Sequence, residues 1–85
     1  MTIRITTSKE NGATTIRVEG RLDAEAAPDL QREVKRAGAP VRLDLSGLMS
    51  ADAEGIKELQ ALSAKGAELR GASAYIRQLL DATSS

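Results

Sequence analysis

Apolar and polar residues alternate in three stretches of the chain, which is the pattern of strands that bury one face. Residues 2–7 and 14–19 carry Ile or Val at alternating places with polar residues between, and residues 41–45 do the same with Val and Leu. Asn11-Gly12 separates the first two stretches, and this dipeptide tolerates the positive φ angles of a tight turn. The pattern therefore predicts an antiparallel hairpin at the start of the chain and a third strand at residues 41–45.

Three other stretches repeat their apolar residues at the three- and four-residue spacing of helices. They are residues 24–37, residues 53–63 and the residues that follow Ser73. Asp23 is expected to cap a preliminary turn, and Pro28 fits only near a helix start, where its missing N–H is not needed. Gly38 and Pro40 are expected to end the first helix.

A capping residue precedes each of the other two helices. Asp52 and Ser73 have side-chain oxygens that can accept hydrogen bonds from the unpartnered amides of a first turn. Between these helices, residues 67–72 are expected to form a short strand around Leu69. In the last helix, Tyr75 is expected to fill the core with its hydroxyl at the surface.

These elements give the order β-β-α-β-α-β-α, and residues 1–85 are expected to form a single α/β domain. Strands that alternate with helices pair in parallel through right-handed crossovers, whereas the first strand is antiparallel. Polar residues at every second place of the strands indicate that one face of the sheet is not covered. We therefore expect a four-stranded mixed sheet with its helices mainly on one face.

The chain contains no Cys and no His, which excludes disulfides, thiolate or histidine catalysis and Cys/His zinc sites. Twelve basic residues balance twelve acidic ones, so no charge field favours nucleic acid or an anionic membrane. No apolar run approaches the roughly 20 residues that span a bilayer. We expect a cytoplasmic protein without cofactor or metal. Its core is small and aliphatic, so a partner or a second copy (a homodimer) would add stability.

Two motifs carry a resemblance to a known family. Residues 44–55, DLSGLMSADAEG, resemble the signature of STAS domains, the bacterial anti-sigma-factor antagonists, in which Asp-Leu-Ser-Gly and a short, mostly apolar stretch precede Asp-Ser-Ser/Thr-Gly. Residues 20–30 match the family's Gly-x-Leu-Asp followed by Ala-Pro-x-Leu. The resemblance implies a STAS-like fold and a non-enzymatic protein-interaction module that acts in partner switching during signal transduction and transcription regulation.

The chain departs from the family where its switching members are phosphorylated. The modified serine falls on Ala53, and Glu54 takes the next hydroxyl position. Ala53 keeps the shape of an unphosphorylated serine, whereas Glu54 adds a negative charge that imitates part of the roughly 1.5 to 2 charges of a phosphoserine. Both interpretations stay open. Ser46 and Ser50 are candidate substitute phosphosites, although loop hydroxyls also serve turns.

The resemblance implies that a partner binds the surface formed by the loop from Ser46 to Asp52 and the helix from Ala53 to Ser63. The candidate partner-binding residues are Ser46, Gly47, Ser50, Asp52, Ala53, Glu54, Gly55 and Lys57. The implied partner is an anti-sigma factor or another histidine-kinase-like ATPase protein.

Three alternatives stay beside this interpretation. The family also includes subunits of lipid-transport ABC complexes and scaffolds of signalling assemblies. Asp52 alternatively serves only as a helix cap, a role worth roughly 1 kcal/mol. A small-molecule site at the helix N-terminus is disfavoured, because two acids there repel phosphate.

Overall fold

The computed structural model describes residues 3–38 and 41–83 of the chain. Within these residues the elements are β1 (Ile3–Glu10), β2 (Ala13–Leu22), α1 (Ala27–Ala37), β3 (Val41–Asp44), β4 (Leu48–Ala51), α2 (Ala53–Ala64), β5 (Glu68–Arg70) and α3 (Ala74–Thr83). Thr2 and Pro40, which were assigned to the first strand and to the end of the first helix, lie outside the described residues.

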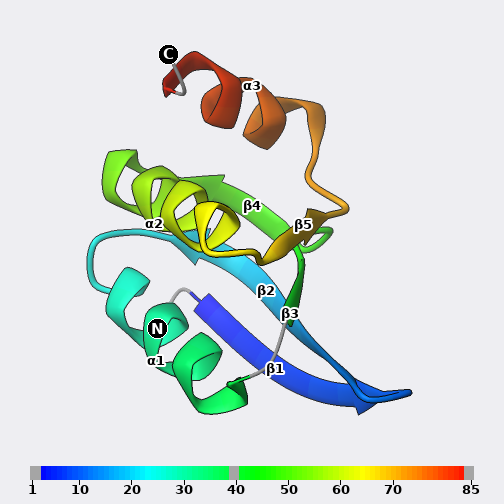
Figure 1. Ribbon diagram of the computed structural model, residues 1–85. Coiled ribbons are helices and arrows are strands. Elements are labelled where there is room, and N and C mark those ends of the chain that lie inside the picture. The colour runs from blue at the N-terminus through cyan, green and yellow to red at the C-terminus, as the bar shows by residue number, and fades with distance from the viewer. Residues whose placement is uncertain (1–2, 39–40, 84–85) are drawn as a thin grey trace.

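The strands form one mixed sheet in the order β1-β2-β3-β5, and β4 pairs with β2 outside that path. β1 is antiparallel to β2, whereas the β2–β3, β2–β4 and β3–β5 pairs are parallel. Figure 1 shows α1 and α2 side by side against one face of the sheet, with α3 beyond β4 and next to α2. The predicted α/β class and the antiparallel first strand are confirmed.

Strand β4 corrects the prediction of a four-stranded sheet. β3 covers only residues 14–17 of β2. Residues 20–22 of β2 therefore remain available to pair with β4. The Gly20 N–H donates to the Gly47 carbonyl at 2.9 Å, and the Asp52 N–H donates to the Leu22 carbonyl at 3.1 Å, so both ends of β4 are held against β2. Its four residues, LMSA, show too little alternation to be separated from a loop in sequence.

The register places polar and apolar side chains on opposite faces of the sheet. Ile16, Val18, Val41 and Leu43 are buried beneath the helices. The opposite face carries charged and hydroxyl side chains in register across the strands. They are Arg4, Thr6, Ser8, Thr15, Arg17, Glu19, Arg42, Asp44, Glu68 and Arg70. We call this surface the open face.

The first helix starts later than the sequence predicted. α1 begins at Ala27 and not at residue 24, because Asp23 holds a separate turn in front of it. The Asp23 carboxylate accepts hydrogen bonds from the backbone N–H groups of Glu25 at 3.1 Å and Ala26 at 2.9 Å. Pro28 then lies in the first turn of α1, as expected for a residue without an N–H. The predicted preliminary turn is confirmed, but the predicted helix boundary is wrong.

Fewer residues of the last helix pack against the core than the sequence predicted. Ile76 of α3 is fully buried, and Leu79 and Leu80 are half-buried against the core. Ser73 caps this helix by accepting a hydrogen bond from the Ile76 N–H at 3.2 Å, as predicted. Tyr75, however, is 54% exposed, so the prediction that it fills the core is wrong. It lies one residue before Ile76, about 100° around the helix from the packed side.

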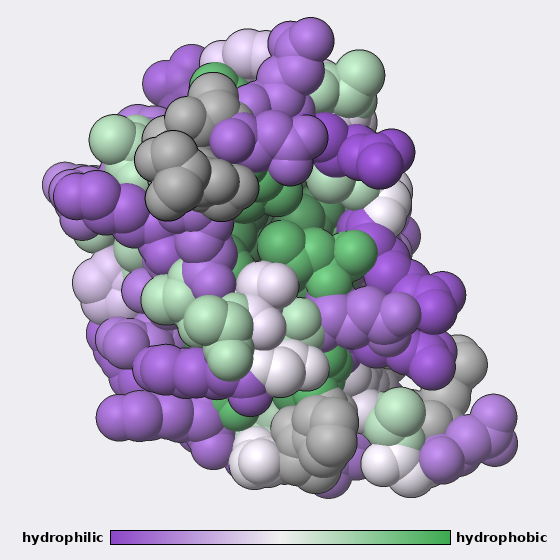
Figure 2. Space-filling view, turned by 45° about the horizontal axis from the view of Figure 1, so that its top comes forward, coloured by the Kyte–Doolittle hydropathy of each residue, from purple (hydrophilic) through white to green (hydrophobic). Residues whose placement is uncertain are grey.

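One side of the molecule has a mainly hydrophilic surface (Figure 2). Figure 2 shows one side of the molecule, on which hydrophilic side chains form most of the outline and apolar ones appear in a central hollow. No helix in residues 3–38 and 41–83 is long and apolar enough to cross a membrane.

Candidate functional site

Asp52 fixes the start of α2 and also ties it to the turn that precedes α1. Its backbone is extended, and its Oδ1 accepts a hydrogen bond from the Gly55 N–H at 2.8 Å, which confirms the predicted N-cap. Its Oδ2 accepts a second bond from the Ala24 N–H at 3.2 Å. One exposed carboxylate therefore joins two segments that are 28 residues apart in sequence.

Gly55 has a structural role that depends on its small size, and a partner cannot contact it. It is buried, and a Cβ built on it would overlap the Leu22 carbonyl oxygen. The first turn of α2 therefore rests directly on the end of β2, and only glycine allows this approach. Gly47 also lies close to β2, where an added Cβ would meet the Glu19 side chain at 2.7 Å.

Four exposed residues surround this fixed backbone. Asp52, Ala53, Glu54 and Lys57 all present their side chains to solvent at the start of α2. We call these four residues the docking tip. Lys57 Nζ lies 3.7 Å from Glu54 Oε1, so the negative charge beside Ala53 has a cation next to it. Neither position 53 nor position 54 offers a hydroxyl that could accept a phosphoryl group.

Ser46 and Gly47 lie at the other end of β4, away from the docking tip. Four strand residues span roughly 13 Å at about 3.3 Å per residue, so residues 46–52 do not form the single loop that was predicted. The Ser46 hydroxyl and N–H donate to Asp44 Oδ1 at 2.7 and 3.0 Å. Both bonds lower the pKa of the Asp44 carboxyl, and the bond from the hydroxyl has the larger effect. Ser50 is half-buried within β4.

Met49 is a surface residue that the sequence interpretation did not single out. It lies in β4 between these two groups, and it is 79% exposed. Exposed methionines are adaptable apolar contacts and are enriched at protein interfaces. In a strand, Met49 and the buried Leu48 point to opposite faces, so the sequence would place Met49 at the surface. The sequence alone did not show that this segment is a strand, and Met49 was therefore missed.

A groove of about 330 Å³ runs from the docking tip between α1 and α2. Small and apolar residues alternate with polar ones in its walls: Ala24, Ala27, Pro28 and Gln31 lie on one side, and Glu54, Lys57, Glu58 and Ala61 lie on the α2 side. The Oε2 atom of Glu58 is buried and has no hydrogen-bond partner among the described residues. A buried carboxylate oxygen without a donor costs free energy.

The described residues include no group of three His, Cys, Asp or Glu side chains that could hold a metal ion. The carboxylates of Asp52 and Glu54 are engaged with backbone amides and with Lys57 respectively. The site therefore offers shape, charge and hydrogen-bonding groups for contact with another molecule.

Comparisons with known proteins identify the family and the fold. The family model described as Mlab, STAS domain, matches residues 5–84. The crystal structure of an antisigma-factor antagonist STAS domain from Rhodobacter sphaeroides superposes with a TM-score of 0.64 at 22% identity, covering 86% of this chain and 94% of that one. The structure of the anti-sigma factor antagonist SpoIIAA in its unphosphorylated form gives a TM-score of 0.65 at 17% identity, covering 93% and 81%. No curated protein matches the sequence.

Proposed function

Because the chain belongs to the STAS domain family, we propose that it is a non-enzymatic module that binds an anti-sigma factor or another histidine-kinase-like ATPase protein through the docking tip. The observation that carries this proposal is the exposure of Asp52, Ala53, Glu54 and Lys57 on a fixed backbone. The Asp52 bonds and the packing of Gly55 hold the tip in place before any partner arrives. A preformed surface loses little conformational entropy on binding.

The docking tip resembles the unmodified state of a switching family member more than the modified one. Ala53 has the size of a serine without its hydroxyl, so it leaves the surface uncharged at that position. Glu54 carries one charge, and Lys57 lies 3.7 Å from it. A phosphoserine carries roughly 1.5 to 2 negative charges and three acceptor oxygens. These differences support a contact that is constitutively competent to bind.

Met49 and the groove extend the proposed contact on either side of the docking tip. Met49 supplies an exposed apolar side chain, which suits the dry centre of a protein interface. Glu58 lines the groove, and its buried Oε2 lacks a donor among the described residues. We propose that the Glu58 side chain turns into the groove on binding and that a Lys, Arg or backbone N–H of the partner donates to its carboxylate.

The test is a binding measurement with an anti-sigma factor encoded beside this chain. We expect a complex by calorimetry that persists after ATP is added, because position 53 cannot be phosphorylated. Ala53→Arg places a long charged side chain in the contact and should weaken binding at least about tenfold, a change of about 1.4 kcal/mol. Ala64→Arg is the matched control, since Ala64 is also exposed but lies at the far end of α2. Unchanged binding by Ala53→Arg would contradict the proposed surface.

A variant with a hydroxyl at position 53 tests whether the rest of the kinase-docking surface is intact. Ala53→Ser, alone or with Glu54→Ser, should fold like the parent because both positions are exposed on the first turn of α2. A kinase-like partner that binds the docking tip should then transfer phosphate to position 53, as measured by intact-protein mass spectrometry. A variant that binds the kinase and gains no phosphate would show that the surface has diverged beyond its hydroxyl.

A second candidate function is a permanent subunit of a larger assembly, such as a lipid-transport ABC complex. The absence of a hydroxyl at positions 53 and 54 favours it, because a permanent subunit needs no switch. Co-purification with an ABC-type ATPase, without affinity for kinase-like proteins, would select this function over the first.

A further inference from the structure

The outer edge of β1 is open for pairing with another strand. In the described part of the chain β1 pairs with β2 alone. The two-residue turn at Asn11 and Gly12, with φ angles of 51° and 80°, makes the residues that flank it a hydrogen-bonded pair. Hydrogen-bonded pairs then alternate along the hairpin, so the backbone N–H and C=O groups of Ile3, Ile5 and Thr7 point away from β2. An eight-residue edge of this kind is a template for strand addition.

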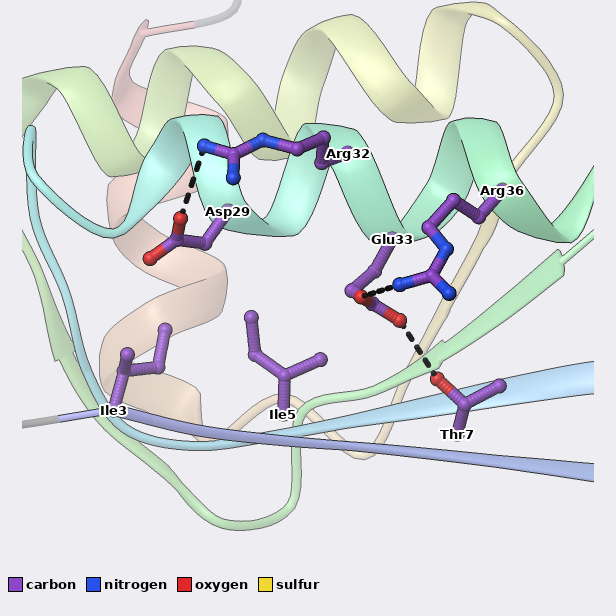
Figure 3. A pocket seen from close by; sticks show the side chains of 7 residues that line it. All are labelled: Ile3, Ile5, Thr7, Asp29, Arg32, Glu33 and Arg36. Atoms are coloured by element: carbon purple, nitrogen blue, oxygen red, sulfur yellow. Dashed lines mark hydrogen bonds and ion pairs between the residues drawn. The ribbon is translucent and has the colours of Figure 1, made fainter.

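A groove of about 500 Å³ follows this edge between β1 and α1. Figure 3 shows Ile3, Ile5 and Thr7 rising from β1 toward four charged side chains of α1. Ile3 and Ile5 are only half-buried, and the Thr7 hydroxyl donates to Glu33 Oε2 at 3.4 Å. A strand added to β1, with a helix above it, would cover these two isoleucines.

The charged side of α1 is complementary to an antiparallel copy of itself. Asp29, Arg32, Glu33 and Arg36 alternate in sign and lie on one side of the helix, at spacings of three, four and seven residues. A two-fold axis that passes between positions 32 and 33 places Asp29 opposite Arg36 of a second copy. The same axis places Arg32 opposite Glu33. Every charge of the row therefore meets its opposite.

The pairing of two β1 strands and the pairing of two α1 helices place the two-fold axis at the same position. Two antiparallel β1 strands in a continuous sheet are related by an axis perpendicular to the sheet, and both α1 helices then lie on the same side of it. Thr7 contacts Glu33, and the middle of the charged row lies above the stretch between Ile5 and Thr7 (Figure 3). An axis through Thr6 places Ile5 opposite Thr7. These are the residues whose backbone groups point outward, so the strand pairing and the charge pairing share one axis.

We propose that a second copy of this chain occupies the groove, with the two β1 strands paired antiparallel about Thr6 and the two α1 helices side by side. The dimer covers Ile3 and Ile5 and joins the two sheets into one. None of the groove residues belongs to the docking tip, so both tips stay exposed, and the inference is independent of the proposed function.

Analytical ultracentrifugation of two charge-reversal variants tests the pairing. The parent protein should sediment as a dimer that dissociates on dilution through the micromolar range. Arg32→Glu places two acids opposite each other, and Glu33→Arg places two bases opposite each other, so each variant alone should dissociate about tenfold more readily. An equimolar mixture should recover the dimer, because the mixed pair joins only opposite charges. A structural defect in either variant would not be repaired by mixing.

Lys35→Glu is the matched control for these variants. It reverses a charge on the same helix, but Lys35 lines a different pocket, with Gly38 and Leu62, and should leave the dimer unchanged. A parent protein that stays monomeric at every concentration, or a mixture that does not recover the dimer, would overturn the proposal. The monomeric outcome would leave the β1 edge to a strand of another protein.

A cysteine cross-link tests the register directly, because the chain has no Cys of its own. In the proposed dimer Thr6 faces Thr6 of the second copy as a non-hydrogen-bonded pair, with Cα atoms about 4.5 Å apart, which a disulfide can bridge. Thr6→Cys should therefore form a covalent dimer on mild oxidation. Arg4→Cys, two residues away on the same face, lies opposite Ser8 and should not. Equal cross-linking of both variants would refute the register.

Discussion

The packing of single residues decides whether α2 can begin where it does. Gly55 lies against the Leu22 carbonyl, and Asp52 bonds both to Gly55 and to the turn before α1. The sequence could predict the cap, because an Asp before an apolar periodic stretch has a known local role. It could not predict the close approach of Gly55 to β2, which depends on a strand 33 positions earlier.

Gly55→Ala should destabilise the protein by about 1 to 3 kcal/mol through overpacking. The added methyl would overlap a backbone carbonyl, which cannot rotate out of the way as a side chain can. Urea unfolding followed by circular dichroism measures the loss. Gly47→Ala is the control, since its methyl meets the flexible, half-buried Glu19 side chain and should cost less. An equal loss for both variants would contradict the role assigned to Gly55.

Glu58→Gln should weaken partner binding while leaving the free energy of unfolding nearly unchanged. The parent has a buried carboxylate oxygen without a donor among the described residues, so removal of its charge takes away little that stabilises the free protein. A donor from the partner would lose a charged acceptor, and hydrogen bonds to charged groups are worth roughly 1.5 to 3 kcal/mol. Calorimetry and urea unfolding, carried out on the same samples, separate the two effects. A large loss of stability with unchanged affinity would mean that Glu58 has only a structural role.

At the scale of elements, local patterns predicted most of the fold. The alternation of Ile16 and Val18 and the spacing of Ile56, Leu59 and Leu62 predicted buried faces, and the structure buries all five. One strand and the start of one helix were missed for physical reasons. β4 is too short for its pattern to be visible, and α1 starts late because Asp23 forms its own turn.

The turn after β3 should make stability depend on acid pH. The pKa of Asp44 is lowered, first by the Ser46 hydroxyl and then by its N–H, so folding favours the charged carboxylate. This contribution is present above the unfolded pKa of about 3.8 and is lost as the pH falls through the lower folded pKa. Glu68, whose pKa is lowered by its bond to Arg70, acts with the same sign.

Asp44→Asn should therefore show a shallower fall in the free energy of unfolding between pH 5 and pH 2 than the parent protein, as measured by urea titration at each pH. Ser46→Ala removes only the hydroxyl bond and should lie between the two. Identical pH profiles for all three proteins would show that the turn does not contribute to acid sensitivity.

At the scale of the whole molecule, the helices cover one side of the sheet and charged residues cover the other. The position of residues 52–57 at the start of α2 could be predicted from the sequence, because Asp52 is a local helix cap. The separation of Ser46 from Asp52 did not, because it depends on β4 pairing with β2. The groove beside β1 could not be predicted from the sequence either, because it is lined by the first strand and by residues 29–36, which are far apart in the chain.

Substitutions on the open face should be nearly neutral for stability. Arg17 is exposed, and its pair with Glu19 is 3.8 Å long, so Arg17→Ala should change the free energy of unfolding by less than about 0.5 kcal/mol. Ile16→Ala, one residue away on the buried face, should cost about 2 to 5 kcal/mol. Thermal unfolding of the two variants makes the comparison. Similar losses for both would contradict the division of the sheet into two faces.

The open face has a practical consequence for the study of this protein. A lone cysteine introduced at position 17 would be the sole thiol in the chain, and it would lie on the opposite side of the sheet from α1 and α2. A fluorophore or a biosensor surface attached there would leave the rest of the protein facing the solution in one defined orientation.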